Sequence, residues 1–210
     1  VIAFNGGQIY DPFHKKTIYG KTIKKEVAKT LFQEALDRGL HVQSYSDTSV
    51  LAMKDTPELH YYIDRSTVPY EIVPDVDAAF PFDPYKILLV GLDNRSELEK
   101  YQRECVEPLE GTVRSFFSTE YYLEIAPEGV SKGFAVEWMC DYLGIPLENS
   151  VAAGDAPNDV EMIRAAHVGA VMCNAYEGVA EHGDYVTERD NNHDGVAEII
   201  ERFLLKKGDE

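Results

Sequence analysis

The stretch Val151-Ala-Ala-Gly-Asp-Ala-Pro-Asn-Asp-Val160 decides the fold of this 210-residue chain. Residues 151–153 are small or β-branched, which suits a fully buried strand of a parallel sheet, and apolar residues recur at helical spacing from Asp159 onward. A strand therefore gives way to a helix between Gly154 and Asn158. Because ligands of open α/β sheets bind beyond the carboxyl ends of the strands, we expect a functional site at this turn.

Two carboxylates flank the predicted turn. Asp155 and Asp159 are four residues apart, so one is expected at the strand end and the other in the first helical turn, beside the same crevice. Mg²⁺ binds through one or two protein carboxylates with water and phosphate oxygens, and it fits this pair better than a metal that needs His or Cys. The alternative is that Asp155 or Asn158 only caps the helix. The ten residues alone do not separate these interpretations.

The composition narrows the possible partners. With 44% hydrophobic residues the chain can form a core, and 20 Lys+Arg against 37 Asp+Glu give a formal charge of -17. That charge argues against nucleic acid and against an anionic membrane as partners. Cys105, Cys140 and Cys173 are odd in number and widely spaced, which favours a reducing, cytoplasmic location. No run of 18 apolar residues occurs, so no transmembrane helix is expected.

The residues up to position 126 are expected to form an antiparallel α+β subdomain after an initial strand. The predicted elements are a buried strand at 1–4, strands at 8–10 and 14–19, a helix that Thr22 caps and Gly39 ends, paired strands at 40–45 and 49–53, a short helix at 74–80, a strand at 85–91, a helix at 96–108, and strands at 112–117 and 121–126. This part shows no obvious catalytic cluster.

After Pro127, predicted helices alternate with predicted strands. A helix opens at Ser131 and ends at Gly144, strands follow at 151–153, 168–172 and 184–187, a short helix lies near Glu177, and a last helix covers 194–205. Such alternation predicts a parallel, doubly wound sheet.

Lys132 is a second candidate for chemistry because it lies in the first turn of the helix that opens at Ser131. A cation there is unfavourable with the helix dipole unless an anion lies nearby, whereas an ammonium together with backbone N–H groups can hold a phosphate. The alternative for a lysine considered by itself is a solvated surface position.

Four short motifs follow one another in a specific order: Ser131-Lys132-Gly133, Gly154-Asp155-x-x-Asn158-Asp159, Val171-Met-Cys-Asn174-Ala175 and Asp194-Gly195-Val196-Ala197. In this order and spacing the chain resembles the Cof-type phosphatases of the haloacid dehalogenase-like (HAD) superfamily. The resemblance implies a Rossmann-like parallel-sheet core with an inserted α+β cap domain, divided as 1–20 core, 21–126 cap and 127–210 core. It also implies that Lys132 holds the transferring phosphoryl group, that Asp155 binds Mg²⁺, and that Asn158 and Asp159 orient phosphate and metal-bound water.

The chain departs from the family pattern at its start. The family opens with Asp-x-Asp-Gly-Thr, whose first Asp is the nucleophile and whose second is the acid/base, and neither occurs in this chain. We therefore expect an incomplete core whose nucleophile lies in an amino-terminal segment of the same protein, upstream of Val1. The implied function is a Mg²⁺-dependent phosphatase of small phosphorylated metabolites such as sugar phosphates, acting through an aspartyl-phosphate intermediate, with the 210-residue chain inactive by itself. The alternative is a non-catalytic phosphate- or sugar-binding or interaction module.

Overall fold

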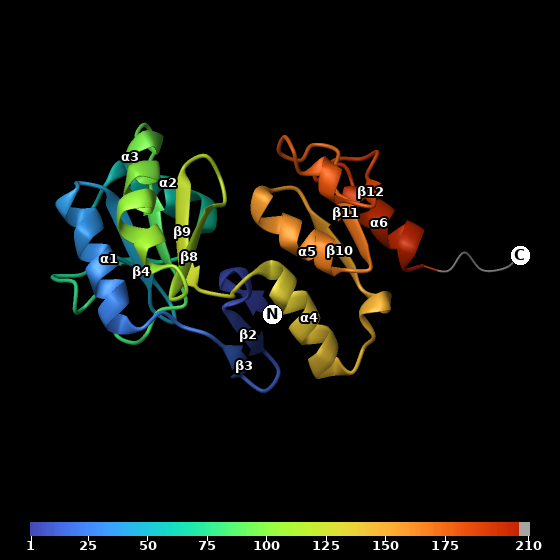
Figure 1. Cartoon of the computed structure of the whole chain (residues 1–210), viewed down its shortest axis with the longest axis horizontal. Helices are drawn as coiled ribbons and strands as arrows, with labels where there is room; N and C mark the ends of the chain where they lie inside the picture. The colour runs from blue at the N-terminus through green and yellow to red at the C-terminus, as the bar shows by residue number, and fades with distance from the viewer. Residues whose placement is uncertain (206–210) are drawn as a thin grey trace, which may run out of the picture. The chain divides into compact units, whose positions relative to one another are not determined.

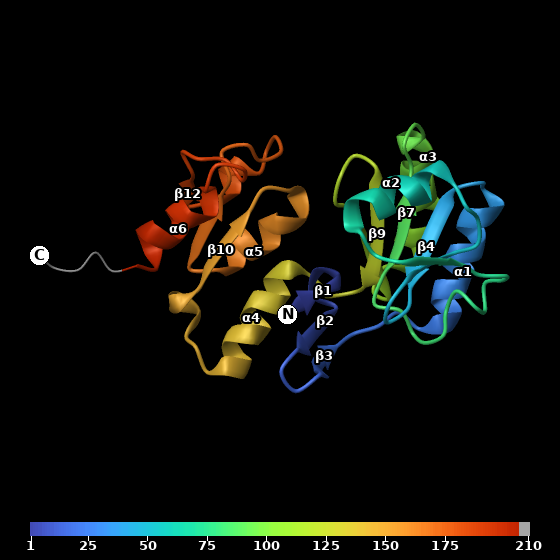
Figure 2. The same ribbon diagram turned by 180° about the vertical axis from the view of Figure 1, so that it is seen from behind.

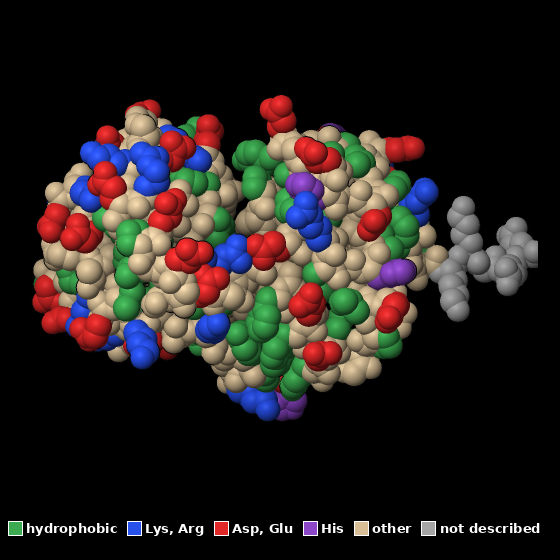
Figure 3. All heavy atoms as spheres, in the orientation of Figure 1, with side chains coloured by type: hydrophobic (Ala, Val, Ile, Leu, Met, Phe, Trp, Pro, Cys, Tyr) green, Lys and Arg blue, Asp and Glu red, His purple; other side chains and the backbone are tan. Residues whose placement is uncertain are grey.

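The computed structural model describes residues 1–205 and has two compact units, Val1–Val130 and Ser131–Glu210. Among residues 1–205, no helix is long and apolar enough to cross a lipid bilayer. Acidic side chains are spread over the face of each unit seen in Figure 3, with basic side chains among them. The division into core, cap and core at residues 20 and 126 stays a prediction.

A six-stranded sheet with the order β6-β5-β4-β7-β9-β8 forms the centre of the amino-terminal unit. All neighbouring strands are antiparallel except β5 and β6. The strands are β4 (His41–Tyr45), β5 (Val50–Ala52), β6 (Tyr70–Ile72), β7 (Ile87–Val90), β8 (Val113–Phe117) and β9 (Tyr122–Pro127). The paired strands predicted at 40–45 and 49–53, and at 112–117 and 121–126, are confirmed.

Helices cover both faces of this sheet. In Figure 1, α1 (Lys25–Asp37) and α3 (Arg95–Tyr101) lie over one face, and Figure 2 shows α2 (Pro57–Ser66) over the other. Side chains alternate between the faces of a strand, so Val42, Leu89 and Leu123 point together into the core beneath α1 and α3. A smaller cluster around Leu59 holds α2 in place.

The first twenty residues form a separate antiparallel sheet of β1 (Ile2–Ala3), β2 (Gln8–Asp11) and β3 (Lys16–Gly20). The predicted buried strand at 1–4 is wrong, because Val1 is 69% exposed and β1 ends after two residues. The strand ends there because Phe4 and Asn5 take positive φ values of 50° and 54°.

Three further differences from the predictions lie in the amino-terminal unit. Helix α1 begins at Lys25 with Lys24 at its N-cap, not at Thr22. Residues 74–80 form turns, in which the Ala78 N–H donates to Asp75 Oδ1 at 2.8 Å, and not a helix. Helix α2 and strand β6 lie between positions 53 and 74, where no element is predicted from the sequence.

The carboxyl-terminal unit contains a parallel sheet with the order β10-β11-β12. Its elements are α4 (Lys132–Leu143), β10 (Val151–Gly154), α5 (Val160–Ala165), β11 (Val168–Val171), β12 (Tyr185–Val186) and α6 (Gly195–Phe203). Ile163 of α5 packs with Val171 on one face, and Ile199 of α6 packs with Ala170 on the other. The predicted parallel sheet with helices on both faces is confirmed.

Candidate active site

The Asp159 carboxylate holds the turn between β10 and α5 together. Its Oδ2 accepts hydrogen bonds from the backbone N–H groups of Asp155 and Ala156, each at 3.1 Å. The Asp159 N–H in turn donates to the Ala156 carbonyl oxygen at 2.9 Å. Only 6% of the Asp159 side chain is exposed, so Asp159 is a buried residue that stabilises the turn through these hydrogen bonds.

Gly154 leaves space for the Asp159 side chain because it has no Cβ atom. A Cβ atom at Gly154 would lie 2.4 Å from the Cβ and 2.9 Å from the Cγ of Asp159. Such separations are far below the roughly 3.5–4.0 Å of an ordinary carbon contact. The glycine of the Gly-Asp pair is therefore required for a steric reason, since it lets the carboxylate of Asp159, five residues later, reach the turn amides.

Lys132 is brought to the same turn by the start of α4. Ser131 caps this helix, with its Oγ accepting from the Phe134 N–H at 3.0 Å. The Lys132 ammonium pairs with Asp159 Oδ1, and the lysine side chain is 30% exposed. An ammonium carries three N–H donors, so one ion pair leaves donors for an anion. Lys132 is therefore not a freely solvated surface lysine.

Gly133 sets how closely α4 approaches α5. A Cβ atom at Gly133 would lie 2.6 Å from the Glu161 carbonyl oxygen, which belongs to the backbone of α5. The two helices therefore meet backbone to backbone at the residue next to Lys132. This contact fixes the helix start that carries the ammonium relative to the turn that carries Asp159.

Asp155 differs from Asp159 in that its carboxylate makes no hydrogen bond or ion pair within the described residues. Within residues 1–205, the half-buried Asp155 carboxylate has neither a hydrogen-bond donor nor a cation as partner. Its backbone is held on both sides, since its N–H donates to Asp159 Oδ2 and its carbonyl oxygen accepts from the Tyr176 N–H at 2.8 Å. A fixed backbone with a free carboxylate is suited to binding an external cation.

The helix-cap alternative for this stretch does not hold. The N-cap of the 157–159 turn is Ala156, and the N-cap of α5 is Asp159. Asp155 precedes both caps, and Asn158 lies half-buried inside the turn. Neither residue has the position that the alternative requires.

The turn can supply one protein ligand to Mg²⁺, the carboxylate of Asp155. Across the described residues, no group of three or more His, Cys, Asp or Glu side chains could hold a metal ion. Asp159 is already bound to Lys132 and to two amides, which leaves Asp155 as the available carboxylate. Because Mg²⁺ takes only one or two protein carboxylates and completes its shell with water and phosphate oxygens, one such ligand is compatible with this ion.

At the same edge of the sheet the structure joins Asn174, which belongs to one of the four motifs, to Asn191, which the sequence analysis did not single out. Asn174 follows β11, and the pairing of Gly154 with Val171 brings the ends of β10 and β11 to one edge of the sheet. The Asn174 side chain exchanges hydrogen bonds with Asn191, whose loop follows β12. Gly195 of the motif Asp194-Gly195 lies directly against this loop, since a Cβ atom at Gly195 would lie 2.4 Å from the Arg189 carbonyl oxygen.

Residues 1–200 match the family model of the haloacid dehalogenase-like hydrolases. The chain belongs to this family. Among its HAD relatives is the 5-amino-6-(5-phospho-D-ribitylamino)uracil phosphatase YwtE of Bacillus subtilis, which is 26% identical over 97% of this chain and 78% of the relative. Several other HAD relatives carry phosphatase names, so the family supports a phosphatase enzyme.

Solved HAD structures share the fold. A haloacid dehalogenase-like hydrolase from Bacteroides thetaiotaomicron superimposes with a TM-score of 0.85 at 29% identity, over 94% of this chain and 74% of that chain. The protein TM0651 from Thermotoga maritima gives a TM-score of 0.79 at 31% identity, over 96% and 74%. The expected HAD fold, a mixed α/β structure with a parallel-sheet core, is thereby confirmed.

Proposed function

We propose that this chain forms the cap and the carboxyl-terminal part of the core of a Mg²⁺-dependent phosphatase that acts on small phosphorylated metabolites. The observation that carries the proposal is the difference between the two carboxylates of one turn. Asp159 is paired with Lys132, whereas the Asp155 carboxylate is free at the carboxyl end of β10. A cation is therefore paired with one carboxylate of this short turn, and the other carboxylate is left free within residues 1–205.

Each residue of the turn has a separate role in the proposed reaction. Lys132 neutralises charge that develops on the transferring phosphoryl group, and Asp159 keeps its ammonium in place. Asn158 orients the bound phosphate from within the turn. Asp155 contributes a ligand to Mg²⁺, which when bound supplies Lewis-acid stabilisation of phosphate oxygens.

The nucleophile of the proposed aspartyl-phosphate route lies in an amino-terminal segment outside this chain. Two features of the carboxyl-terminal unit support a core that another segment completes. In the described residues β10 pairs only with β11, so its second edge carries unpaired backbone groups. Helix α4 bears apolar residues around its circumference, and its Tyr142 and Leu143 are 53% and 54% exposed. A helix that is apolar all round is usually buried.

The proposed substrates are phosphate esters of sugars and sugar-like polyols. The name of YwtE describes a phosphorylated ribityl chain on an aminouracil, so this ester is a specific candidate alongside common sugar phosphates. We place the reaction in the reducing cytoplasm, in keeping with the free thiols of Cys105, Cys140 and Cys173.

The test is Asp155→Asn in the protein that carries its amino-terminal segment. We expect Mg²⁺-dependent hydrolysis of an aryl phosphate to fall by about 100-fold or more, since even outer-shell partners of a metal are worth about 10–100-fold. Stability should stay within about 0.5 kcal/mol of wild type, because the carboxylate has no hydrogen bond or ion pair to lose within residues 1–205.

Asp141→Asn serves as the matched control, because Asp141 is an exposed aspartate of α4 in the same unit. It should hydrolyse the aryl phosphate as the wild type does. Undiminished activity in Asp155→Asn would remove Asp155 from the site. A wild-type protein that binds phosphate but hydrolyses no ester would instead favour the non-catalytic binding module.

A further inference from the structure

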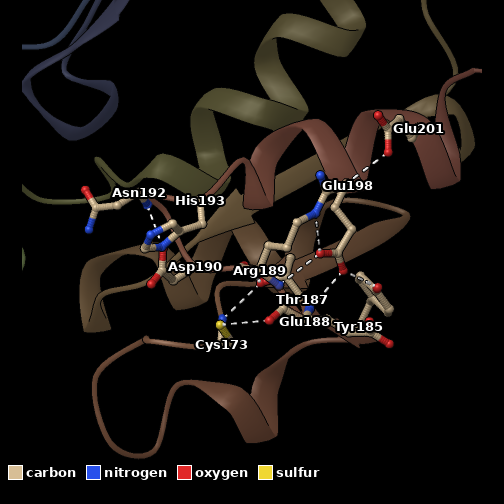
Figure 4. A network of polar contacts seen from close by, with 10 residues as sticks. All are labelled: Cys173, Tyr185, Thr187, Glu188, Arg189, Asp190, Asn192, His193, Glu198 and Glu201. Atoms are coloured by element: carbon tan, nitrogen blue, oxygen red, sulfur yellow. Dashed lines mark hydrogen bonds and ion pairs between the residues drawn. The ribbon is translucent and has the colours of Figure 1, made fainter.

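Glu198, in the first turn of α6, binds four hydrogen-bond donors with one carboxylate (Figure 4). Its Oε1 accepts from the Tyr185 hydroxyl and from the Glu188 N–H at 2.9 Å. Its Oε2 accepts from the N–H of Arg189 at 3.0 Å and from the Arg189 Nε at 3.3 Å. The hydroxyl bond from Tyr185 is the main cause that lowers the pKa of the Glu198 carboxyl to about 2. Glu198 therefore stays ionised and holds the loop that follows β12.

This loop, residues 187–191, is bound in turn to the segment after β11. The buried Thr187 accepts from the Cys173 N–H at 3.0 Å through its Oγ1, and Figure 4 shows Cys173 lying against Thr187 and Glu188. Asn191 makes a reciprocal pair with Asn174, in which Asn174 Nδ2 donates to Asn191 Oδ1 at 2.9 Å and the Asn191 N–H donates to Asn174 Oδ1 at 3.3 Å.

The segment after β11 is bound to the Asp155 backbone. The Tyr176 N–H donates to the Asp155 carbonyl oxygen at 2.8 Å, and the Met172 N–H donates to the Gly154 carbonyl oxygen at 3.0 Å. Three successive sets of hydrogen bonds therefore connect the Glu198 carboxylate to the residue that carries the free carboxylate of the candidate site.

We propose that Glu198 is a positioning residue for Asp155, acting through loop 187–191 and the segment 173–176. The expected effect of Glu198 on Mg²⁺-dependent hydrolysis rests on the proposed function. The expected effect on the backbone of segment 173–176 does not. Two of the donors that Glu198 binds are backbone N–H groups of the loop, so its loss releases the loop backbone itself and not only a side chain.

The structural test compares Glu198→Gln with Glu201→Gln by backbone amide hydrogen exchange. Glu201 lies on the same helix and also pairs with Arg189, at 3.1 Å, but within residues 1–205 it makes no hydrogen bond to the loop backbone, which makes it a matched control. Glu198→Gln should speed exchange of the Cys173 and Tyr176 amides by about fivefold or more, while Glu201→Gln leaves them unchanged. Faster exchange confined to Glu188 and Arg189 would overturn the proposal.

The kinetic test measures the Mg²⁺ concentration that gives half-maximal hydrolysis of an aryl phosphate. In Glu198→Gln this concentration should rise by about 3- to 10-fold, below the range for a direct outer-shell partner, while the rate at saturating Mg²⁺ changes less than about twofold. Asn191→Ala weakens the next link without touching Glu198, because it removes the acceptor of the Asn174 Nδ2 bond and keeps the backbone N–H bond, and it should shift the half-maximal concentration in the same direction. The double variant should not exceed the larger single effect, because both changes interrupt one path.

A purely structural role would lower the rate at every Mg²⁺ concentration and leave the half-maximal concentration unchanged, which would overturn the positioning role. If Glu198→Gln fails to fold, Asn191→Ala decides by the same two measurements. Absence of any hydrolysis by the wild type would refute the proposed function, and amide exchange would still decide whether Glu198 controls the Asp155 backbone.

Discussion

Gly154→Ala tests the steric account of the turn that carries the candidate site. The added Cβ would lie 2.4 Å from Asp159 Cβ, 2.9 Å from its Cγ and 3.0 Å from its Oδ2. Asp159 cannot withdraw without loosening the Lys132 pair and the two turn amides. Overpacking costs about 1–3 kcal/mol and a weakened hydrogen bond about 1 kcal/mol, against a gain of about 0.4–1 kcal/mol from a less flexible unfolded chain. The net expected destabilisation is about 1–4 kcal/mol.

The assay is urea unfolding followed by the fluorescence of Trp138. The chain has one tryptophan, and it lies on α4, so the signal reports the carboxyl-terminal unit. Asp159→Gly removes the Cβ that the new methyl group would meet, so in that background Gly154→Ala should cost less than about 1 kcal/mol. Wild-type stability of Gly154→Ala, or an equal cost in both backgrounds, would refute the reasoning.

Three further predictions concern charge and the proposed missing segment. Lys132→Met, similar in length without the charge, should weaken phosphate binding and slow turnover by about 100-fold, measured by aryl phosphate kinetics, and an unchanged rate would return Lys132 to a structural role. The chain of residues 1–210 alone should hydrolyse no aryl phosphate in the presence of Mg²⁺. Addition of the proposed amino-terminal piece in trans should restore activity. Hydrolysis by the purified chain, free of contaminating enzyme, would contradict the proposal and require another nucleophile. The pKa of Glu198 falls from 4.5 to about 2 on folding, so its stabilisation is complete above pH 4.5 and is lost as the pH falls through about 2. The difference in unfolding free energy between wild type and Glu198→Gln should therefore be constant above pH 4.5 and shrink below it, and a difference that does not change with pH would contradict the assigned cause.

The carboxyl-terminal unit was predictable from sequence because several signals agreed there. Ser131 and Gly144 mark the ends of α4, and in the structure Ser131 caps the helix while Gly144 takes the left-handed conformation that follows it. The apolar strands 151–153 and 168–172 are bounded by turn residues, and their pairing in parallel follows from the helix between them. Local preference and overall topology point to the same structure in this part of the chain.

In the amino-terminal unit the local signals conflicted or were not recognised. Residues 1–4 look like a buried strand by composition, but the positive φ values of Phe4 and Asn5 break it, and Asn5 instead donates from Nδ2 to Glu124 Oε2 at 2.8 Å. That partner is 119 positions away and is not visible in the sequence. The start of α2 did carry a signal, since Thr56 caps it and Pro57 occupies its first turn, but the surrounding prolines obscured it.

The sequence predicted which residues meet at the candidate site but not how they differ. Lys132 and Asp159 are 27 positions apart, and their ion pair depends on the close contact of α4 with α5. Hydrogen bonds to backbone amides decide that Asp159, and not Asp155, stabilises the turn. A sequence pattern does not contain these backbone contacts. The loop that Glu198 holds was missed for the same reason, because the two donors that this loop's backbone gives to Glu198 are main-chain N–H groups.

The contact of Gly133 with the Glu161 carbonyl bears on how the sequence of this unit can diverge. Because the two backbones touch without a side chain between them, the distance from α4 to α5 does not depend on the volumes of neighbouring core residues. Apolar positions such as Ile163 and Val171 can exchange size in compensating pairs while the reach from Lys132 to Asp159 is preserved. Evolution can thus vary the packing of the unit extensively and still inherit the same reactive geometry, so long as the glycine is retained.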